Sequence, residues 1–452
     1  MWYVDEIVKA VNGKLLRNEK SFFSGISTDS RTIKDGELFI PLSGRNFDGH
    51  TFIKYAYDRS HGGSICETGR QDMLHDGGTI VLVDDAMNAL IKLAHYKKQL
   101  VKSRIIAITG SNGKTTTKEI LVNILKKGFS LHYNEKNYNN AIGVSKSILS
   151  MTGKPDFCIF ELGTNNKGEI RQLAQMIEPD ISLITNVNPS HLEGLSNIKG
   201  VLEEKLSLFN CTKDNGSIIV NADDPNILKN YKMGQHKVTA YGMQNEADFK
   251  LSIEKNLGWD GAILVFRSPD FEIRTKTTLL GKHNLYNILA ASTIASITGT
   301  SAELISEGIE TFDPYAMRFK PFRSGKGFII LDDTYNANPS SMEWAIKTLL
   351  DLPCKGSRMV ILGDMQELGG KTNFYHKKLG NFLRNTGIQK ILLIGNHMKN
   401  ALEELKNYDT ALIFENKKEI IEYALQNLKE NDAVLVKGSR TSKMEEIAEA
   451  LK

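Results

Sequence analysis

The sequence predicts an α/β protein of three domains, in which the two larger domains are built on parallel sheets. The chain has 452 residues, which exceeds what one hydrophobic core usually serves. Over most of its length, apolar runs of strand length alternate with helical stretches, a pattern typical of parallel sheets covered by helices on both faces. Residues 248–280 instead alternate apolar and polar positions, as antiparallel strands do.

The N-terminal domain is expected to be a small α/β unit that spans residues 1–102. Gly- and Asp-rich turns are frequent in it. The apolar patterns predict a strand at residues 79–83 and a helix over residues 86–100.

The central domain, residues 103–312, is expected to begin with a buried strand at 105–108. A Gly-containing turn and a helix over residues 114–127 follow, and Gly128 ends the helix. Further strands are expected at residues 158–162, 181–187 and 217–221. The alternating stretch adds antiparallel strands to this parallel sheet, and a helix over residues 284–297 comes after it.

The C-terminal domain, residues 313–452, is expected to be doubly wound and Rossmann-like. Its strand candidates alternate with helices and lie at residues 328–332, 359–362, 391–394, 411–414 and 433–436. No repeat of solenoid period is visible, so short linkers should join the three domains.

The composition narrows the classes of function. The chain is 41% hydrophobic and 24% charged, with a net charge of +4 spread along it, so neither nucleic acid nor an anionic membrane is an expected partner. Residues 1–10 lack the pattern of a signal peptide, and the longest apolar runs are too short for membrane insertion. Four scattered cysteines without zinc spacing indicate reduced thiols. We therefore expect a cytoplasmic chain, and a monomer.

Residues 105–116 carry the strongest functional signal. They read Ile-Ile-Ala-Ile-Thr-Gly-Ser-Asn-Gly-Lys-Thr-Thr, a strand followed by a turn of small residues and the start of a helix. Phosphate binding needs converging backbone N–H groups, a helix N-terminus, a lysine and a hydroxyl for Mg²⁺. The expected ATP contacts are Gly110, Ser111, Asn112, Gly113, Lys114, Thr115 and Thr116.

One feature of this loop departs from the standard P-loop pattern. The first glycine of that pattern would stand at position 108, where the chain has Ile108, and the early glycine is Gly110 instead. The alternative interpretation is a Gly-rich turn with an incidental lysine. We favour a phosphate loop of P-loop type, because strand, loop and helix follow one another in the required order.

The variant Thr-Gly-x-x-Gly-Lys-Thr, residues 109–115, resembles the phosphate loop of the Mur ligases and of their relatives, the folylpolyglutamate synthetases. Further segments resemble the central domain of that family, at residues 139–144, 161–163, 185–187, 191–193 and 281–287. Segments in the other domains are similar to the Mur ligase that joins D-alanyl-D-alanine to UDP-N-acetylmuramoyl-tripeptide, at residues 27–31, 48–50, 332–342, 362–369 and 436–440. The resemblance covers essentially the whole chain.

The resemblance implies a reaction in which ATP converts a peptide carboxylate into an acyl phosphate, which an incoming amine attacks. The implied catalytic residues are Lys114, Glu161, His191 and Lys205. Two Mg²⁺ sites are implied: Thr115 and Glu161 at the first, and His191 and a carbamylated Lys205 at the second. From the residues alone, His191 would be a structural hydrogen-bonding residue and Lys205 a solvated lysine.

The same resemblance implies the remaining site residues. Those near the nucleotide are His283, Asn284, Asn287, Arg318 and Asp333. Those at the UDP-sugar-peptide are Ser27, Thr28, Asp29, Ser30, Arg31, Asp48, Gly49, His50, Asn139 and Asn140. Those at D-alanyl-D-alanine are Asn336, Asn338, Lys437 and Arg440.

Two alternatives stay open. One is a sister amide ligase, either a folylpolyglutamate synthetase or the Mur ligase that adds the third residue, although those lack the segments seen here at 335–339 and 363–369. The other is a catalytically inactive nucleotide-binding relative, which the joint presence of all four implied catalytic residues disfavours. The chain also departs from the family at Ser145, where proline is usual, and at residues 165–167, where Asn-His-Pro is usual.

Overall fold

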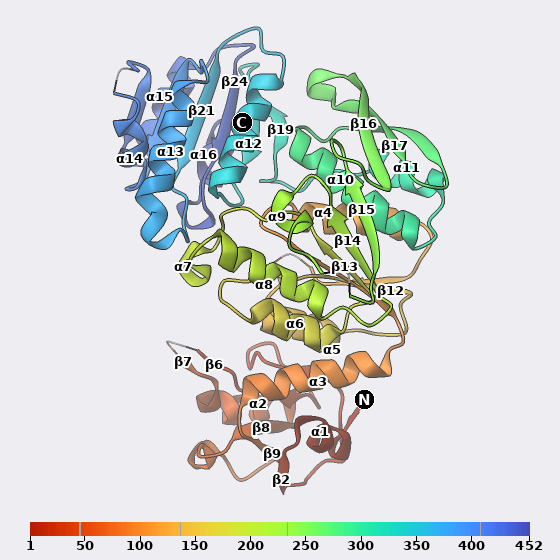
Figure 1. The fold of residues 1–452 in the computed structure, drawn as a ribbon. Coiled ribbons are helices and arrows are strands. Elements are labelled where there is room, and N and C mark those ends of the chain that lie inside the picture. Colours follow the sequence, from red (N-terminus) through yellow and green to blue (C-terminus); the bar gives the residue numbers. More distant parts are fainter. Residues whose placement is uncertain (45–46, 136, 233, 407) are drawn as a thin grey trace. The chain divides into compact units, whose positions relative to one another are not determined.

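The computed structural model describes residues 1–44, 47–135, 137–232, 234–406 and 408–452 (Figure 1). Contacts between residues group the chain into two compact units. Unit 1 comprises Met1–Ile105, His132–Leu162 and Gln172–Glu178, and unit 2 comprises Ile106–Leu131, Gly163–Arg171 and Pro179–Lys452. The chain passes between the units several times, and the three domain ranges expected from the sequence stay predictions.

Unit 1 contains a five-stranded sheet with the order β2-β9-β8-β5-β4. Its strands are β2 (Lys14–Arg17), β9 (Thr79–Val83), β8 (Gly63–Glu67), β5 (Leu38–Phe39) and β4 (Ile26–Ser27). Strand β2 runs antiparallel to β9, and the other neighbours are parallel. Two-residue strands form two further antiparallel pairs, β1 (Trp2–Tyr3) with β3 (Phe22–Phe23) and β6 (Ser43–Gly44) with β7 (Phe47–Asp48).

Side chains of β9 alternate between two cores. Val81 and Val83 pack with helices α1 (Val4–Val11) and α3 (Ala86–Leu100), whereas Ile80 packs with α2 (Ile53–Ser60). Unit 1 also holds α5 (Ala141–Leu149), which contacts α3, and the buried strand β12 (Phe157–Glu161). The predictions of a strand at 79–83, a helix at 86–100 and a strand near 158–162 are confirmed.

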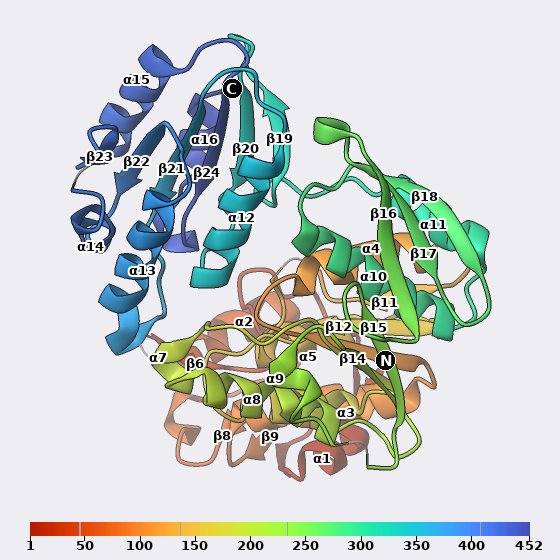
Figure 2. The same ribbon diagram turned by 45° about the horizontal axis from the view of Figure 1, so that its top comes forward.

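Unit 2 contains a run of neighbouring strands in the order β10-β13-β14-β15-β16-β17-β18. They are β10 (Arg104–Thr109), β13 (Ile181–Ile184), β14 (Ser217–Asn221), β15 (Lys237–Gly242), β16 (Phe249–Asn256), β17 (Ala262–Arg267) and β18 (Glu272–Thr277). The first five are parallel, and β16, β17 and β18 form an antiparallel ribbon (Figure 2). The predicted parallel sheet with an antiparallel addition is confirmed, although β15 was not predicted.

Two helices of unit 2 pack against each other, α4 (Lys114–Leu125) and α10 (Lys282–Ile297). Helix α10 buries side chains on all sides, as expected for a helix enclosed by other elements. The other helices of this part are α7 (Leu192–Leu195), α8 (Ile198–Asn210), α9 (Pro225–Leu228) and α11 (Ala302–Glu310). Both predicted helices, at 114–127 and 284–297, are confirmed within two residues.

The C-terminal part of unit 2 is a six-stranded sheet with the order β19-β20-β24-β21-β22-β23. Its strands are β19 (Lys320–Arg323), β20 (Ile329–Asp333), β24 (Ala433–Lys437), β21 (Arg358–Gly363), β22 (Lys390–Ile394) and β23 (Ala411–Phe414). Only β19 is antiparallel to its neighbour. The five strands predicted here are confirmed within one residue at each end.

Helices cover both faces of this sheet (Figures 1 and 2). They are α12 (Pro339–Asp351), α13 (Thr372–Arg384), α14 (Met398–Glu403), α15 (Lys417–Asn427) and α16 (Glu445–Ala450). Successive strand residues point to opposite faces: Leu362 packs with α12, α13 and α14, whereas Ile361 packs with α15 and α16. The predicted doubly wound arrangement is confirmed. Among the described residues, no helix combines the length and the apolar character needed to cross a membrane.

Candidate active site

Two glycines shape the loop between β10 and α4. Gly110 has φ 151° and Gly113 has φ 81°, values that residues with side chains rarely adopt. A Cβ on Gly110 would collide with Thr185 Oγ1, and a Cβ on Gly113 would collide with Asn287 Oδ1. The unusual position of the first glycine is therefore a packing requirement of this loop.

Hydrogen bonds from the segment that follows β13 hold the loop in place. The backbone N–H of Ser111 donates to Asn186 O at 2.9 Å, and that of Asn112 donates to Asn186 Oδ1 at 3.1 Å. Ser111 Oγ donates to Asn188 O at 2.8 Å. Lys114 begins α4, and its Nζ lies over the loop and donates to Gly110 O at 2.8 Å. The loop is thus rigid and carries a cation at a helix N-terminus, where phosphate groups bind readily.

The implied cap of the nucleotide, Arg318, reaches the same loop. Its Nη2 donates to Thr115 Oγ1 at 3.1 Å, and its guanidinium lies 3.9 Å from the ring centroid of Tyr335. Asp333 lies at the end of β20 and pairs with the buried Lys437, with 2.5 Å between Oδ2 and Nζ. Burial raises the pKa of Asp333 above its ordinary value, and the Lys437 ammonium opposes that shift.

Lys205 lies in α8 and is 1% exposed. Its pKa is well below the ordinary value for lysine, first because burial disfavours the ammonium form and second because Lys114 repels it. The charge of the adjacent Glu204 opposes the shift and is the smallest of these three causes. Lys205 therefore gives up its proton more readily than an exposed lysine does.

Glu204 is 4% exposed and binds the segment that leads into α6 (Glu169–Ile177). It accepts the backbone N–H groups of Gly168 and Ile170, both at 2.7 Å, and the hydroxyl of Thr164 at 3.3 Å. A carboxylate bonded to a helix N-terminus is well stabilised there. Glu204 therefore fixes α8 against residues 164–170, which include the loop that departs from the family pattern.

His191 precedes α7 and has a left-handed backbone, with φ 51°. Its Nδ1 lies 2.7 Å from Oε2 of Glu367, which is in the loop after β21. The contact with His191 lowers the pKa of Glu367, while partial burial opposes this change. Thr115, His191 and Lys205 thus all lie in unit 2, with Lys114 close enough to Lys205 to repel it.

Comparison with known proteins gives three matches to family models. The Mur ligase family catalytic domain matches residues 23–107, the Mur ligase middle domain residues 108–295, and the Mur ligase glutamate ligase domain residues 317–440. A UDP-N-acetylmuramoyl-tripeptide–D-alanyl-D-alanine ligase of Bacillus subtilis is 31% identical over 453 aligned residues, which cover 99% of this chain and 98% of the relative. The chain belongs to the Mur ligase family.

Solved structures agree with this placement. A MurF crystal structure from Acinetobacter baumannii has a TM-score of 0.91 and 26% identity, covering 100% of this chain and 98% of that one. A MurF ligase from Thermotoga maritima in complex with ADP has a TM-score of 0.86 and 26% identity, covering 94% of this chain and 96% of that one.

In unit 1 of this Mur ligase, Glu161 ends strand β12 and is buried. Its Oε1 accepts the side-chain N–H of Asn139 at 2.9 Å, and its backbone N–H donates to Asn134 Oδ1 at 2.8 Å. Asn140 caps α5 by accepting the N–H of Gly143 at 2.9 Å. Asn139, expected at the substrate, thus contacts Glu161, expected at a metal, and the assignments of Asn139 and Asn140 to the substrate stay predictions.

The residues expected at the UDP-sugar form two separate groups in unit 1. In the segment of residues 27–31, Arg31 donates to both carboxylate oxygens of Asp29, and this lowers the pKa of Asp29 to about 2. In the segment of residues 48–50, His50 is buried and its Nδ1 lies 2.8 Å from Asp48 Oδ1. The N–H of Glu67 donates to His50 Nε2 at 3.2 Å, so Nδ1 carries the proton. His50 thus orients Asp48, and the assignment of both residues to the UDP-sugar stays a prediction.

The residues expected near the adenine of this Mur ligase lie in the first turns of helix α10. Asn284 donates to Leu280 O at 2.9 Å, and Asn287 donates to Asn284 Oδ1 at 3.1 Å. His283 stacks on Trp344 of α12, with ring centroids 6.2 Å apart and planes 6° apart. Burial lowers the pKa of His283 to about 4, so the ring is neutral.

The residues expected at the dipeptide cluster at the ends of β20 and β24. Lys437 Nζ donates to Asn336 O at 2.9 Å. Asn338 caps α12 and donates to Asn112 Oδ1 at 2.7 Å, so it contacts the phosphate loop. Arg440 pairs with Glu445 at 2.9 Å.

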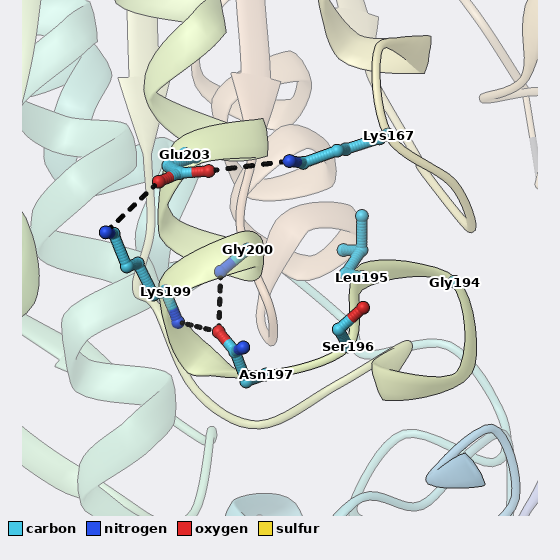
Figure 3. Close-up of a pocket in the computed structure, with 8 residues that line it drawn as sticks. All are labelled: Lys167, Gly194, Leu195, Ser196, Asn197, Lys199, Gly200 and Glu203. Carbon is cyan, nitrogen blue, oxygen red and sulfur yellow. Dashed lines mark hydrogen bonds and ion pairs between the residues drawn. The ribbon is translucent and has the colours of Figure 1, made fainter.

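A cavity of about 230 Å³ opens beside the N-terminus of α8, away from these residues (Figure 3). Asn197 caps the helix there, and Lys167 and Lys199 both pair with Glu203. The two lysines thus share one carboxylate, and none of the predicted site residues lines the cavity.

Sequence analysis missed four residues of this region: Asn186, Asn188, Glu367 and Trp344. Glu367 lies inside a segment that resembles the family, so it was visible as part of a motif but without a role. Asn186 lies inside the strand expected at residues 181–187 and Asn188 follows it, although β13 ends at Ile184, so both lie beyond the real strand end, where ligand-binding residues of α/β sheets gather. Trp344 lies in the interior of a helix, and no local pattern marked it.

Proposed function

We propose that this Mur ligase joins D-alanyl-D-alanine to UDP-N-acetylmuramoyl-tripeptide with the consumption of ATP, as the last cytoplasmic peptide-adding step of peptidoglycan precursor synthesis. The observation that carries the proposal is the similarity to the Bacillus subtilis ligase of that name, which spans 99% of this chain and 98% of the relative. The ADP bound to the Thermotoga maritima relative supports the use of a nucleotide.

The reaction has two steps. A carboxylate oxygen of the tripeptide attacks the γ-phosphorus of ATP, so that the bond to ADP breaks and an acyl phosphate forms. The amine nitrogen of D-alanyl-D-alanine then attacks the carbonyl carbon, phosphate leaves, and the amine proton is released. Charge accumulates on the transferring phosphoryl group, and Lys114 at the N-terminus of α4 is the cation that this chain supplies there.

The resemblance assigns Mg²⁺ to this chain, and the Thr115 hydroxyl and the Glu161 carboxylate are oxygen donors of the kind this ion prefers. In unit 2 the proposed ligands are the Thr115 hydroxyl, His191 and Lys205, and in unit 1 the proposed ligand is the Glu161 carboxylate. Lys205 qualifies only as a carbamate, because an ammonium group has no lone pair to offer. Its burial favours the neutral amine, which is the form that reacts with CO₂. Bound Mg²⁺ would neutralise charge on the phosphoryl group.

Substrate contacts are assigned by the same resemblance. Arg318 and Asp333 are assigned to the nucleotide, and Lys437 with Arg440 to the dipeptide. Support comes from Arg318, which contacts Thr115 of the phosphate loop, and from Asn338, which contacts Asn112 of the same loop.

The test is a coupled assay with purified protein, ATP, Mg²⁺, UDP-N-acetylmuramoyl-tripeptide and D-alanyl-D-alanine. Phosphate release that requires the dipeptide, together with a UDP-pentapeptide detected by mass spectrometry, is the expected result. Lys114→Ala should abolish both signals. Turnover with folate and glutamate instead, or with a single amino acid in place of the dipeptide, would show a sister ligase. No turnover with any of these would show an inactive relative.

A further inference from the structure

His191 and Glu367 come from distant parts of the sequence and touch in unit 2. Nδ1 of His191 lies at an ion-pair distance of 2.7 Å from Oε2 of Glu367, and this buried nitrogen forms no hydrogen bond with the described residues. The backbones meet as well, because the N–H of Glu193 donates to Glu367 O at 3.1 Å. A Cβ on Gly369 would lie 3.1 Å from Glu193 Cα, so the two segments are packed tightly. The side-chain contact therefore rests on a fixed backbone frame.

Both residues of this contact have a left-handed backbone. The φ angle is 51° at His191 and 63° at Glu367. Residues with side chains seldom adopt such values, and where they do, the surrounding structure enforces them, often at functional sites. These conformations, one on each segment, accompany the approach of the imidazole to the carboxylate.

The pair has the chemistry of an oriented metal ligand. A histidine that binds a metal through one ring nitrogen commonly donates its other ring N–H to a carboxylate, which fixes the tautomer and the ring orientation. We propose that Glu367 is a positioning residue that accepts the Nδ1–H of His191 and so presents Nε2 to the divalent cation. This inference rests on the proposed function, which assigns His191 to the second Mg²⁺.

The experiment measures binding of Mn²⁺, in place of Mg²⁺, by the electron paramagnetic resonance signal of the free ion. Full-length protein is titrated in the presence of ADP and bicarbonate. The part of the binding that is lost in His191→Ala defines the site. Glu367→Ala should weaken that binding about 10- to 100-fold. Glu367→Gln should weaken it less, because an amide oxygen still accepts the Nδ1–H.

A matched control and a double variant separate positioning from other roles. Glu403 is 51% exposed, against 48% for Glu367, and pairs with Lys377 at 3.0 Å, so Glu403→Gln should bind Mn²⁺ as the wild type does. Glu367→Ala added to His191→Ala should cause no further loss, because Glu367 acts through the ring.

Three results would overturn the inference. Unchanged Mn²⁺ affinity in Glu367→Ala would show that the contact has no role in the site. If Glu367→Ala lowered the Mn²⁺ affinity equally in the wild type and in His191→Ala, Glu367 would be a direct ligand. Equal losses of Mn²⁺ affinity in Glu367→Gln and Glu367→Ala would lead to the same conclusion. A wild-type protein that binds Mn²⁺ at His191 but forms no UDP-pentapeptide would contradict the proposed function alone.

Discussion

Adjacent glutamates in α8 offer a direct test of how burial sets the contribution of a charge. Glu204 is 4% exposed and accepts two backbone N–H groups at 2.7 Å, from Gly168 and Ile170. The side chain of Glu203 is 51% exposed and pairs only with Lys167 and Lys199, at 3.7 and 3.9 Å. The perturbations are Glu204→Ala and Glu204→Gln, with Glu203→Ala as the matched control.

The magnitude follows from the bonds that are lost. A hydrogen bond to a charged acceptor contributes about 1.5–3 kcal/mol, so two give about 3–6 kcal/mol. Water that enters the vacated space will replace part of this, and we expect a loss of about 3 kcal/mol in Glu204→Ala. Glu204→Gln keeps an acceptor without the charge and should lose about half as much. Glu203→Ala should change stability by about 0–1 kcal/mol.

The assay is native-state hydrogen exchange at the amides of Gly168 and Ile170, because a chain of this size need not unfold in two states. A loss of about 3 kcal/mol corresponds to roughly 100-fold faster exchange at these two positions. Amides of the C-terminal sheet, such as that of Val434, should exchange as in the wild type. Equal effects of Glu203→Ala and Glu204→Ala would refute the reasoning, since it assigns the whole difference to burial.

Three further predictions concern other parts of the chain. Gly110→Ala forces a Cβ against Thr185 and should lower ADP affinity, measured by calorimetry, at least tenfold. The control Gly325→Ala places its Cβ where no atom lies within 4 Å and should bind ADP as the wild type does. Normal ADP binding in both variants would contradict the packing argument. Lys205→Ala should lose ligase activity and regain part of it with added acetate, and an unimpaired variant would contradict the carbamate assignment. Asp48 has a pKa of about 2, below its unfolded value near 3.9, so its charge stabilises the fold above pH 4 and this contribution is lost as the pH falls toward 2. Asp48→Asn should therefore lower the free energy of unfolding by about 2 kcal/mol at pH 7, as measured by urea unfolding. The difference in unfolding free energy between variant and wild type should shrink below pH 4. A difference that does not depend on pH would point to packing instead.

Much of the fold was predictable because the signals are local. Each strand of the C-terminal sheet is a short apolar run, and its residues alternate between two covered faces, as Ile361 and Leu362 show. The strands that escaped prediction carry weaker signals. Strand β15 mixes exposed and buried residues, and the strands of unit 1 that are only two residues long contain no period to detect.

The phosphate loop was predictable for a similar reason. Glycines, a lysine and hydroxyl residues stand next to one another between a strand and a helix, so the sequence alone predicted a tight loop on a parallel α/β sheet, and the contacts of this loop with ATP stay predictions. The reaction was then predicted from the resemblance to the Mur ligases. Neither kind of evidence required knowledge of contacts between distant residues.

Tertiary structure decided what sequence spacing does not encode. Glu203 and Glu204 are identical and adjacent, yet one is exposed and the other binds a helix N-terminus, because Glu204 is the one that faces residues 164–170. The approach of Glu367 to His191 likewise depends on how two distant loops pack. Backbone conformation and strand periodicity are set by neighbouring residues, whereas burial, pKa and ligand orientation are set by partners that only the folded chain brings together.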